Sequence, residues 1–197
     1  MVKSRRKAGE ATETKLLDSA REIFIEKGFS GASMGAIARH AEMNQSLIYH
    51  YYPSKEDLWN RIKEDLLTAF IKKDVSAPET ANLSFEKVVD ALFVSRIEYY
   101  ADNPEVVRLF KWQSLEDAWG KSPRQREYLD DWISYIRKLQ EAKKVRSDIQ
   151  AEEILTLILG SGWAVFSQQP NPLVSDKAKV ASYVKNIKKL LLESLSL

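Results

Sequence analysis

Side chains that form directional hydrogen bonds are concentrated between residues 44 and 50, where the sequence reads Asn-Gln-Ser-Leu-Ile-Tyr-His. If this stretch is a helix with Ile48 turned inward, then at about 100° per residue Ser46 and His50 point most directly outward. The outward face is completed by Gln45, Leu47 and Tyr49. A helix face of this composition offers hydrogen-bond donors and acceptors beside one aliphatic group.

The chemistry of this face suits double-stranded DNA. Gln45 and Ser46 can donate to and accept from base edges in the major groove, and Leu47 can touch a thymine methyl group. The Tyr49 hydroxyl can reach a phosphate, and His50 can contact a base or a phosphate. For Gln45 and Ser46, the alternative is a solvated helix face that binds no partner.

Two short helices separated by a tight turn must position these residues. Ser33 and Asn44 are good N-caps for the two helices. Met43 and Ile48 have the spacing of a hydrophobic staple, which fixes the direction in which the chain enters the second helix. The pattern predicts a helix-turn-helix, the unit whose second helix lies in the major groove.

The flanking sequence predicts a further helix on each side. One spans about residues 12–27 and ends at Gly28, where a left-handed cap residue is expected. The other is capped by Ser54 and spans about residues 55–72. We expect Tyr51 and Tyr52 to pack against these helices rather than to contact DNA.

Positive charge accompanies the predicted helix-turn-helix. Residues 1–55 contain nine Lys or Arg against six Asp or Glu, and four of the nine lie within residues 1–7. A loose basic arm there can add phosphate or minor-groove contacts, the alternative being a disordered solubilising tail. The helix N-termini at Ser33 and beside Lys55 offer N–H groups to phosphates. Arg39 is the expected helper from the first short helix.

The spacing of these residues resembles the TetR/AcrR family of repressors over about the first 60 residues. The matching positions are Ala20, Phe24, Gly28, Phe29, Ser33, Ile37, Ala38, Ala41, Ile48, Tyr49, Tyr51, Tyr52, Lys55, Glu56 and Leu58.

Two positions depart from the family pattern. Glu42 replaces the usual turn glycine, so strained backbone or an altered turn is expected. Gly35 replaces a frequently polar residue, so one base contact is expected to be missing. The expected DNA-binding residues are Ser33, Arg39, Asn44, Gln45, Ser46, Leu47, Tyr49, His50 and Lys55.

The remaining sequence predicts an all-α fold. Apolar residues recur at helical spacing, and strict alternation of the strand type is scarce. Five further helices are predicted over residues 85–101, 104–118, 123–143, 151–168 and 177–195. A polar stretch over residues 74–84 interrupts the periodicity. We therefore expect a helix-turn-helix DNA-binding domain over residues 1–55, a connecting helix and linker over 56–83, and a helical effector-binding and dimerisation domain over 84–197.

The helix predicted over residues 151–168 is apolar nearly all round, so it must be covered on both sides. A second copy of the chain is the simplest cover, with Gly160 and Gly162 permitting close approach. Similar proteins dimerise through a four-helix bundle formed by their last two long helices. The expected interface residues are Leu155, Ile158, Leu159, Gly162, Val184, Ile187 and Leu191. A two-fold dimer would place recognition helices about 34–36 Å apart on a near-palindromic operator.

Aromatic residues between the linker and the predicted dimer region suit an apolar ligand pocket. The expected ligand-binding residues are Phe93, Arg96, Tyr100, Phe110, Trp112, Trp119, Trp132 and Trp163. Ordinary core packing is the alternative for about half of the rings, and a surface ion pair is the alternative for Arg96. The resemblance implies a small hydrophobic or aromatic effector that moves the fourth helix and weakens operator binding.

Composition argues against other classes of function. The chain has no cysteine and two histidines, so thiolate sites are excluded and we expect neither a metal nor a cofactor. An enzyme using carboxylates such as Glu98, Asp102, Glu116 or Asp117 lacks the usual catalytic partners. A non-specific architectural DNA binder would need a basic surface throughout. A co-regulator that binds a protein partner, and activation in place of repression, both stay open.

The sequence contains no feature that predicts secretion or membrane insertion. No apolar region follows the charged N-terminus, so a signal peptide is not expected. The longest mostly apolar run, residues 154–166, is shorter than the roughly 20 residues of a spanning helix. We expect a cytoplasmic protein.

Overall fold

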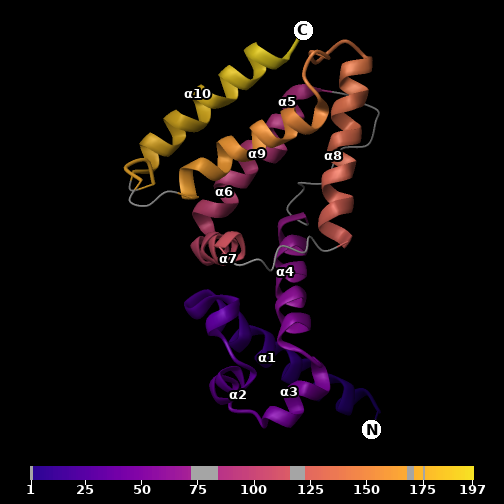
Figure 1. The fold of residues 1–197 in the computed structure, drawn as a ribbon, viewed down its shortest axis with the longest axis vertical. Helices are drawn as coiled ribbons and strands as arrows, with labels where there is room; N and C mark the ends of the chain where they lie inside the picture. Colours follow the sequence, from indigo (N-terminus) through magenta and orange to yellow (C-terminus); the bar gives the residue numbers. More distant parts are fainter. Residues whose placement is uncertain (1, 72–83, 116–122, 168–170, 175) are drawn as a thin grey trace. The chain divides into compact units, whose positions relative to one another are not determined.

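The structure is a computed structural model, and within its described residues the regular structure is helical apart from one isolated bridge between Val145 and Ser196 (Figure 1). The predicted all-α fold is confirmed. The described residues are 2–71, 84–115, 123–167, 171–174 and 176–197. The chain divides into two compact units, one of residues Met1–Leu67 with Arg108–Ser122 and the other of Thr68–Val107 with Pro123–Leu197.

The first unit contains the predicted helix-turn-helix and its flanking helices. Its elements are α1 (Val2–Gly31), α2 (Met34–Ala41), α3 (Gln45–Tyr51) and the larger part of α4 (Lys55–Ile71). Helix α1 begins ten residues before the predicted start at Thr12. Its regular part ends where predicted, because Gly28 has φ 72° and ψ −179°. The positive φ was expected, whereas the extended ψ differs from an ordinary left-handed cap.

An apolar core joins α1 to the three helices that follow. Leu16 and Phe24 of α1, Ile37 of α2 and Ile48 of α3 have no exposed surface. The ring of Phe24 lies edge-on to Trp59 of α4, with centroids 4.9 Å apart. Burial of these side chains removes apolar area from water and fixes α3 on its inner side.

The second unit is a helical bundle. Its elements are α5 (Phe85–Val89), the π-helical η2 (Asp90–Val94), α6 (Ser95–Asp102), the first turn of α7 (Pro104–Leu115), α8 (Pro123–Glu141), α9 (Ala151–Ser167) and α10 (Lys177–Leu195). Segments α5, η2 and α6 follow one another without a break, so the predicted helix over 85–101 is one run with a wider turn inside it. The predicted polar boundary over residues 74–84 lies almost wholly outside the described residues.

Helices α9 and α10 both pack against the α5–η2–α6 run, and a hydrogen bond joins the two helices. Gly162 of α9 faces this run closely, since a Cβ placed there would lie 3.7 Å from Phe93 and 3.8 Å from Ile97. The Tyr183 hydroxyl of α10 donates to the Ser161 carbonyl of α9 at 2.8 Å. Lys188 of α10 forms ion pairs of 2.9 and 2.7 Å with Glu86 and Asp90.

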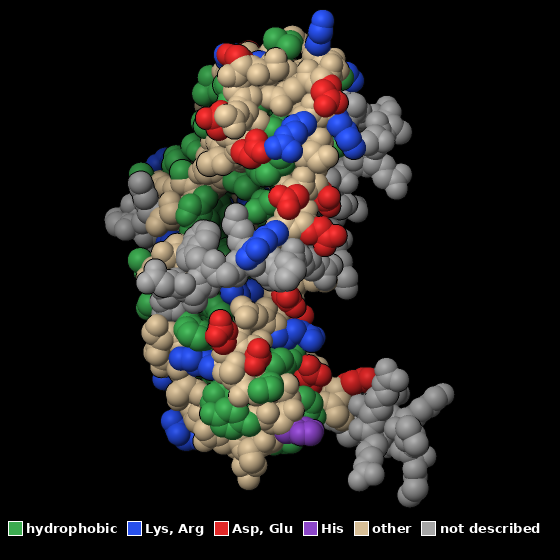
Figure 2. Space-filling view, turned by 45° about the vertical axis from the view of Figure 1, so that its right-hand side comes forward, with side chains coloured by type: hydrophobic (Ala, Val, Ile, Leu, Met, Phe, Trp, Pro, Cys, Tyr) green, Lys and Arg blue, Asp and Glu red, His purple; other side chains and the backbone are tan. Residues whose placement is uncertain are grey.

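Acidic and basic side chains are interspersed on the face of the second unit that Figure 2 shows, toward the top of that view, with hydrophobic side chains between them. The charges on this face therefore do not form the continuous basic surface that a non-specific DNA binder would need. Among the helices of the described residues, none is long and apolar enough to cross a membrane.

Candidate nucleic-acid interface

Both helices of the helix-turn-helix begin at side-chain caps. The Ser33 hydroxyl accepts a hydrogen bond from the Ala36 N–H at 3.2 Å. Asn44 Oδ1 accepts from both the N–H and the hydroxyl of Ser46, each at 3.0 Å. These bonds satisfy N–H groups that the first turn of a helix leaves open. The two predicted N-caps are confirmed.

The turn between α2 and α3 has a left-handed residue that is not glycine. Glu42 has φ 54° and ψ 43°. Its N–H donates to the Arg39 carbonyl at 3.2 Å, and the Met43 N–H donates to the Ala38 carbonyl at 2.9 Å, which together form a Schellman motif. The strained backbone expected at Glu42 is confirmed, and the Glu42 carboxylate lies 3.4 Å from Lys15 Nζ.

Helix α3 has one buried side and one exposed side. Ile48 has no exposed surface, whereas Leu47 is 38% and Tyr49 45% exposed. Gln45, Ser46 and His50 are also exposed. The outward face is therefore the one that a helical spacing of about 100° assigns from Ile48.

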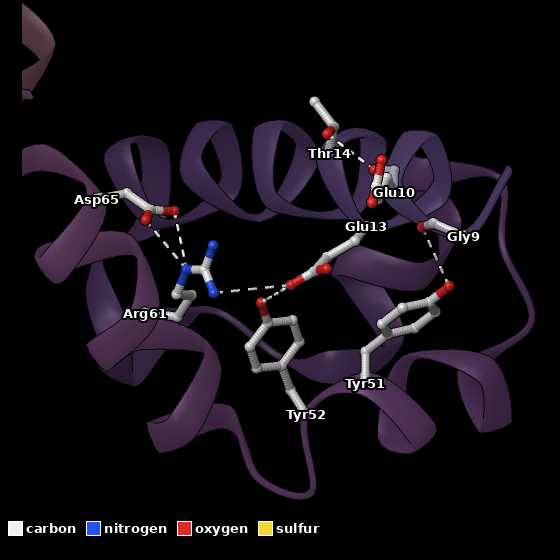
Figure 3. Close-up of polar contacts among 8 residues, drawn as sticks. All are labelled: Gly9, Glu10, Glu13, Thr14, Tyr51, Tyr52, Arg61 and Asp65. Atoms are coloured by element: carbon white, nitrogen blue, oxygen red, sulfur yellow. Dashed lines mark hydrogen bonds and ion pairs between the residues drawn. The ribbon is translucent and has the colours of Figure 1, made fainter. Parts of the chain in front are cut away.

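A polar network fixes the end of α3 on α1 and α4 (Figure 3). The Tyr52 hydroxyl donates to Glu13 Oε1 at 2.8 Å, and the same oxygen lies 3.8 Å from Arg61 Nη1. Arg61 Nε donates to the two carboxylate oxygens of Asp65 at 3.0 and 3.1 Å. Burial, and next the neighbouring Glu13 carboxylate, raise the pKa of Tyr52 well above its ordinary value. Tyr52 therefore remains a hydrogen-bond donor.

The neighbouring tyrosine also contacts α1. Tyr51 is partly buried, and its hydroxyl donates to the Gly9 carbonyl at 3.3 Å (Figure 3). The expected packing of Tyr51 and Tyr52 agrees with this placement. The sequence did not single out Glu13 and Arg61, because each is an ordinary charged residue on a helix and its partner lies in another helix.

Lys55 occupies an unexpected position. Its Nζ donates to the carbonyls of Phe29 and Ala32 at 2.7 and 2.9 Å and lies 4.3 Å from the centre of the Phe29 ring. Lys55 thus donates to carbonyls just after the break at Gly28. The sequence had led us to expect that its charge would be free to contact a phosphate. The cap beside it forms as predicted, since the Asp57 N–H donates to the Ser54 hydroxyl at 3.0 Å.

Family models match both parts of the chain. Residues 16–62 match "Bacterial regulatory proteins, tetR family", and residues 90–190, just over half of the chain, match "Tetracyclin repressor-like, C-terminal domain". The chain belongs to the tetR family of bacterial regulatory proteins. It is therefore a helix-turn-helix protein of transcription regulation, as the sequence pattern indicated.

Individual relatives agree with the family assignment. The HTH-type transcriptional repressor SCO4008 of Streptomyces coelicolor is 28% identical over 164 residues, which cover 81% of each chain. A tetR-family regulator from Shewanella sp. PV-4 shares the fold with a TM-score of 0.75 at 19% identity, covering 94% of this chain and 98% of the other. FadR of Bacillus subtilis, solved in complex with stearoyl-CoA, has a TM-score of 0.70 at 14% identity. The match covers 91% of this chain and 97% of FadR.

The second unit of this tetR-family chain contains a cavity of about 460 Å³. Buried Tyr100, Val107 and Phe166 provide apolar lining, and exposed Glu98 and Lys177 add charged groups. The other lining residues are Ala101, Asp102, Pro104, Val174 and Val180. A cavity of this volume can hold a small molecule.

Of the expected ligand-binding residues that the structure describes, Tyr100 alone lines this cavity. Two others contact Tyr100 without lining the cavity: the Trp163 ring lies 5.8 Å from the Tyr100 ring, and Arg96 Nη1 lies 3.4 Å from the Tyr100 hydroxyl. Phe93 and Trp132 have no exposed surface and belong to the core. No sequence signal marked Val107 or Phe166, since helices from distant parts of the chain form the cavity.

The other expected ligand residues lie elsewhere. The Trp112 indole Nε1 donates to the Ile25 carbonyl of α1 at 3.1 Å, within the first unit. Phe110 is partly exposed and also belongs to the first unit. Trp119 lies outside the described residues.

Burial divides the expected dimer residues into two groups. Leu155, Ile158, Gly162 and Leu191 are buried within the subunit, whereas Leu159, Val184 and Ile187 are partly exposed. The side chains of the first group already pack inside the second unit, so the second group is the better placed of the two to meet a partner. The large apolar residues of the same two helices that are exposed are Leu157 and Leu190, at 51% and 55%.

Proposed function

We propose that this chain is a homodimeric, ligand-responsive repressor that is released from a near-palindromic operator by a small hydrophobic or aromatic effector. The observation that carries the proposal is the exposed polar face of α3, which is built on a buried Ile48 within a capped helix-turn-helix. In this proposal, residues 1–55 bind DNA, and residues 84–197 bind the effector and form the dimer. Residues 56–83 form the helix and linker that connect these two domains.

Each exposed group on α3 has a proposed role. Gln45 and Ser46 read base edges, and Leu47 contacts a thymine methyl group. Tyr49 contacts a phosphate, and His50 contacts a base or a phosphate. Asn44 and Ser33 hold the helix N-termini whose remaining N–H groups face phosphates, and Arg39 adds a charge from α2.

The dimer surface is proposed on α9 and α10. Leu157 and Leu190 are exposed apolar side chains of the kind that a partner covers. A Cβ added at Gly160 would meet no neighbouring atom within 4 Å, so a partner backbone can approach this glycine closely. Partly exposed Val184 and Ile187 extend this surface.

The effector site is proposed at the cavity beside Tyr100. Its lining is mainly apolar, and the fold is shared with FadR, which was solved in complex with stearoyl-CoA. Val107 of α7 lines the cavity, while Trp112 of the same helix is bonded to α1. A ligand that displaces α7 can therefore disturb the DNA-binding unit. Coupling of this kind typically changes the affinity for the second ligand, here the operator, by 5-fold to 150-fold.

Selection from a random duplex DNA library tests the DNA-binding half of the proposal. The wild-type dimer is expected to enrich a near-palindrome, and the Gln45→Ala and Tyr49→Ala variants are expected to lose it. Binding that falls uniformly with salt and shows no enriched sequence would reduce the interaction to phosphate attraction and contradict specific operator binding.

Fluorescence of the apolar dye anilinonaphthalene sulfonate tests the proposed effector site. We expect the wild type to bind the dye and Val174→Trp, which fills the cavity from an exposed position, to bind it weakly. Leu173→Trp is the matched control, since Leu173 is adjacent in sequence but does not line the cavity. Equal dye binding by all three proteins would place the apolar site elsewhere.

A further inference from the structure

Two polar side chains from different helices converge over Gly35. A Cβ placed on Gly35 of α2 would lie 3.6 Å from Oε1 of Gln45, which is the first residue of α3. It would lie 3.7 Å from Nη1 of Arg39, one turn further along α2. Gln45 and Arg39 are both exposed, so their polar ends lie together on the surface of the helix-turn-helix.

We propose that Gly35 is a specificity-determining position of the DNA interface. Because it has no side chain, Gln45 and Arg39 occupy the space above α2 and act as one reading surface built from two helices. The inference rests on the proposed function of α3 as the recognition helix, and it adds a residue that touches neither base nor phosphate.

Backbone conformation does not account for a glycine here. Among the described glycines only Gly28 has a positive φ, so Gly35 has a backbone that any residue can adopt. Glycine is also a poor helix former in comparison with alanine. The remaining local role of the missing side chain is the space that it leaves beside Gln45 and Arg39.

The two separations define which side chains fit this space. Distances of 3.6 and 3.7 Å are ordinary van der Waals contacts, so alanine fits without moving its neighbours. A longer side chain places further carbon atoms where Gln45 and Arg39 now lie. Both neighbours present the far ends of flexible side chains, so these ends move while the helices stay in place.

The two side chains have complementary abilities in base recognition. A glutamine amide can make paired contacts with adenine, and an arginine guanidinium can make paired contacts with guanine. Moving both ends together therefore changes the preferred base pairs, whereas the phosphate contacts of the rest of the interface persist.

The test is a selection from a random duplex library with the full-length wild type, Gly35→Ala and Gly35→Leu, followed by titration of single-base-pair variants. We expect Gly35→Ala to keep the wild-type sequence with affinity within about twofold. We expect Gly35→Leu to lose about 5-fold to 150-fold of discrimination at the base pairs that Gln45→Ala also affects. Leucine and methionine are good helix formers, so Gly35→Met repeats the test if Gly35→Leu lowers the thermal unfolding midpoint.

A double variant identifies the route of the effect. If Gly35 acts through Gln45 and Arg39, then Gly35→Leu has little further effect on base discrimination once both are alanine. An unchanged selected sequence for Gly35→Leu and Gly35→Met, or an undiminished effect in the double-alanine background, would overturn the inference. Failure of the wild type to select any sequence would instead refute the proposed function itself.

Discussion

At the scale of single residues, one carboxylate joins three helices of the first unit. Glu13 of α1 accepts from Tyr52, which follows α3, and lies 3.8 Å from Arg61 of α4. A recognition helix has to be held within a fraction of an ångström to read bases, and hydrogen bonds at its end supply that constraint. Tyr52 and Glu42 provide separate tests of how this local geometry is maintained.

Removal of the Tyr52 hydroxyl is expected to reduce stability in a pH-dependent way. At pH 7, Tyr52→Phe should lower the free energy of unfolding by about 1 kcal/mol, the typical contribution of one hydrogen bond. The pKa of the folded Tyr52 is raised above the ordinary value of 10.0. Above pH 10 the unfolded state loses the Tyr52 proton before the folded state does, so the stability of the wild type falls as pH rises. The phenylalanine variant has no such proton and should lack this part of the pH dependence.

Urea unfolding at pH 7 and over pH 9–11 measures both effects. Tyr49→Phe is the matched control, because this tyrosine belongs to the same region but is 45% exposed. The control should leave the free energy of unfolding near that of the wild type. Equal losses in the two variants would argue against a specific role for the Tyr52 hydroxyl.

Glu42→Gly is expected to stabilise the fold. A left-handed conformation costs a residue with a Cβ roughly 1–2 kcal/mol, and glycine avoids this cost but loses part of the gain through its freer unfolded chain. The exposed ion pair with Lys15 contributes little. We expect a net gain of about 0.5–1 kcal/mol by thermal unfolding. Glu42→Ala, which keeps the strain, should show no gain, and a gain equal to that of glycine would contradict the explanation.

At the scale of helices, local signals define most boundaries but not the start of α1. Caps at Ser33, Asn44 and Ser54 and the break at Gly28 occur where the sequence places them. The helical backbone nevertheless extends to Val2, so the residues expected to form a loose arm continue the helix. Their charge still gives this segment a testable contribution to DNA binding.

Neutralising the basic segment should reduce the salt dependence of operator binding. The variant replaces four residues by glutamine: Lys3, Arg5, Arg6 and Lys7. Each lost phosphate contact lowers the slope of log affinity against log salt by about 0.9. We expect a smaller slope with an unchanged selected sequence, measured by titrating one operator at several salt concentrations.

The control for this prediction neutralises the same number of charges in α10. Its four residues are Lys177, Lys179, Lys185 and Lys189, all exposed. The control should keep the wild-type slope. If the N-terminal variant also keeps it, the segment makes no phosphate contact and acts only as a solubilising end.

At the scale of the whole molecule, the proposed function requires two copies of the chain and both units within each copy. The division between the units falls inside α4 and α7, so both helices contain residues of each unit. The exposed apolar residues on α9 and α10 then define where a second copy is proposed to dock. Dimerisation would place two recognition helices on one operator.

Charges introduced on this surface should separate the dimer. We expect the double variant Leu157→Lys with Leu190→Lys to be monomeric by light scattering after gel filtration. Its operator affinity should fall about 100-fold or more, because the two half-site contacts are no longer linked. Leu115→Lys is the control, since Leu115 is 78% exposed and lies outside these helices. A double variant that stays dimeric would place the interface elsewhere.

The sequence by itself determined the features that depend on neighbours within one or two turns. The helix-turn-helix, its caps, the strained Glu42 and the outward face of α3 follow from spacing around Ile48 and from polar residues at helix ends. Only the tertiary structure decided which face of α9 is internal, where Lys55 donates, and which residues line the cavity beside Tyr100. These outcomes depend on packing between segments far apart in the chain, and helical periodicity specifies that a face is buried without specifying what covers it.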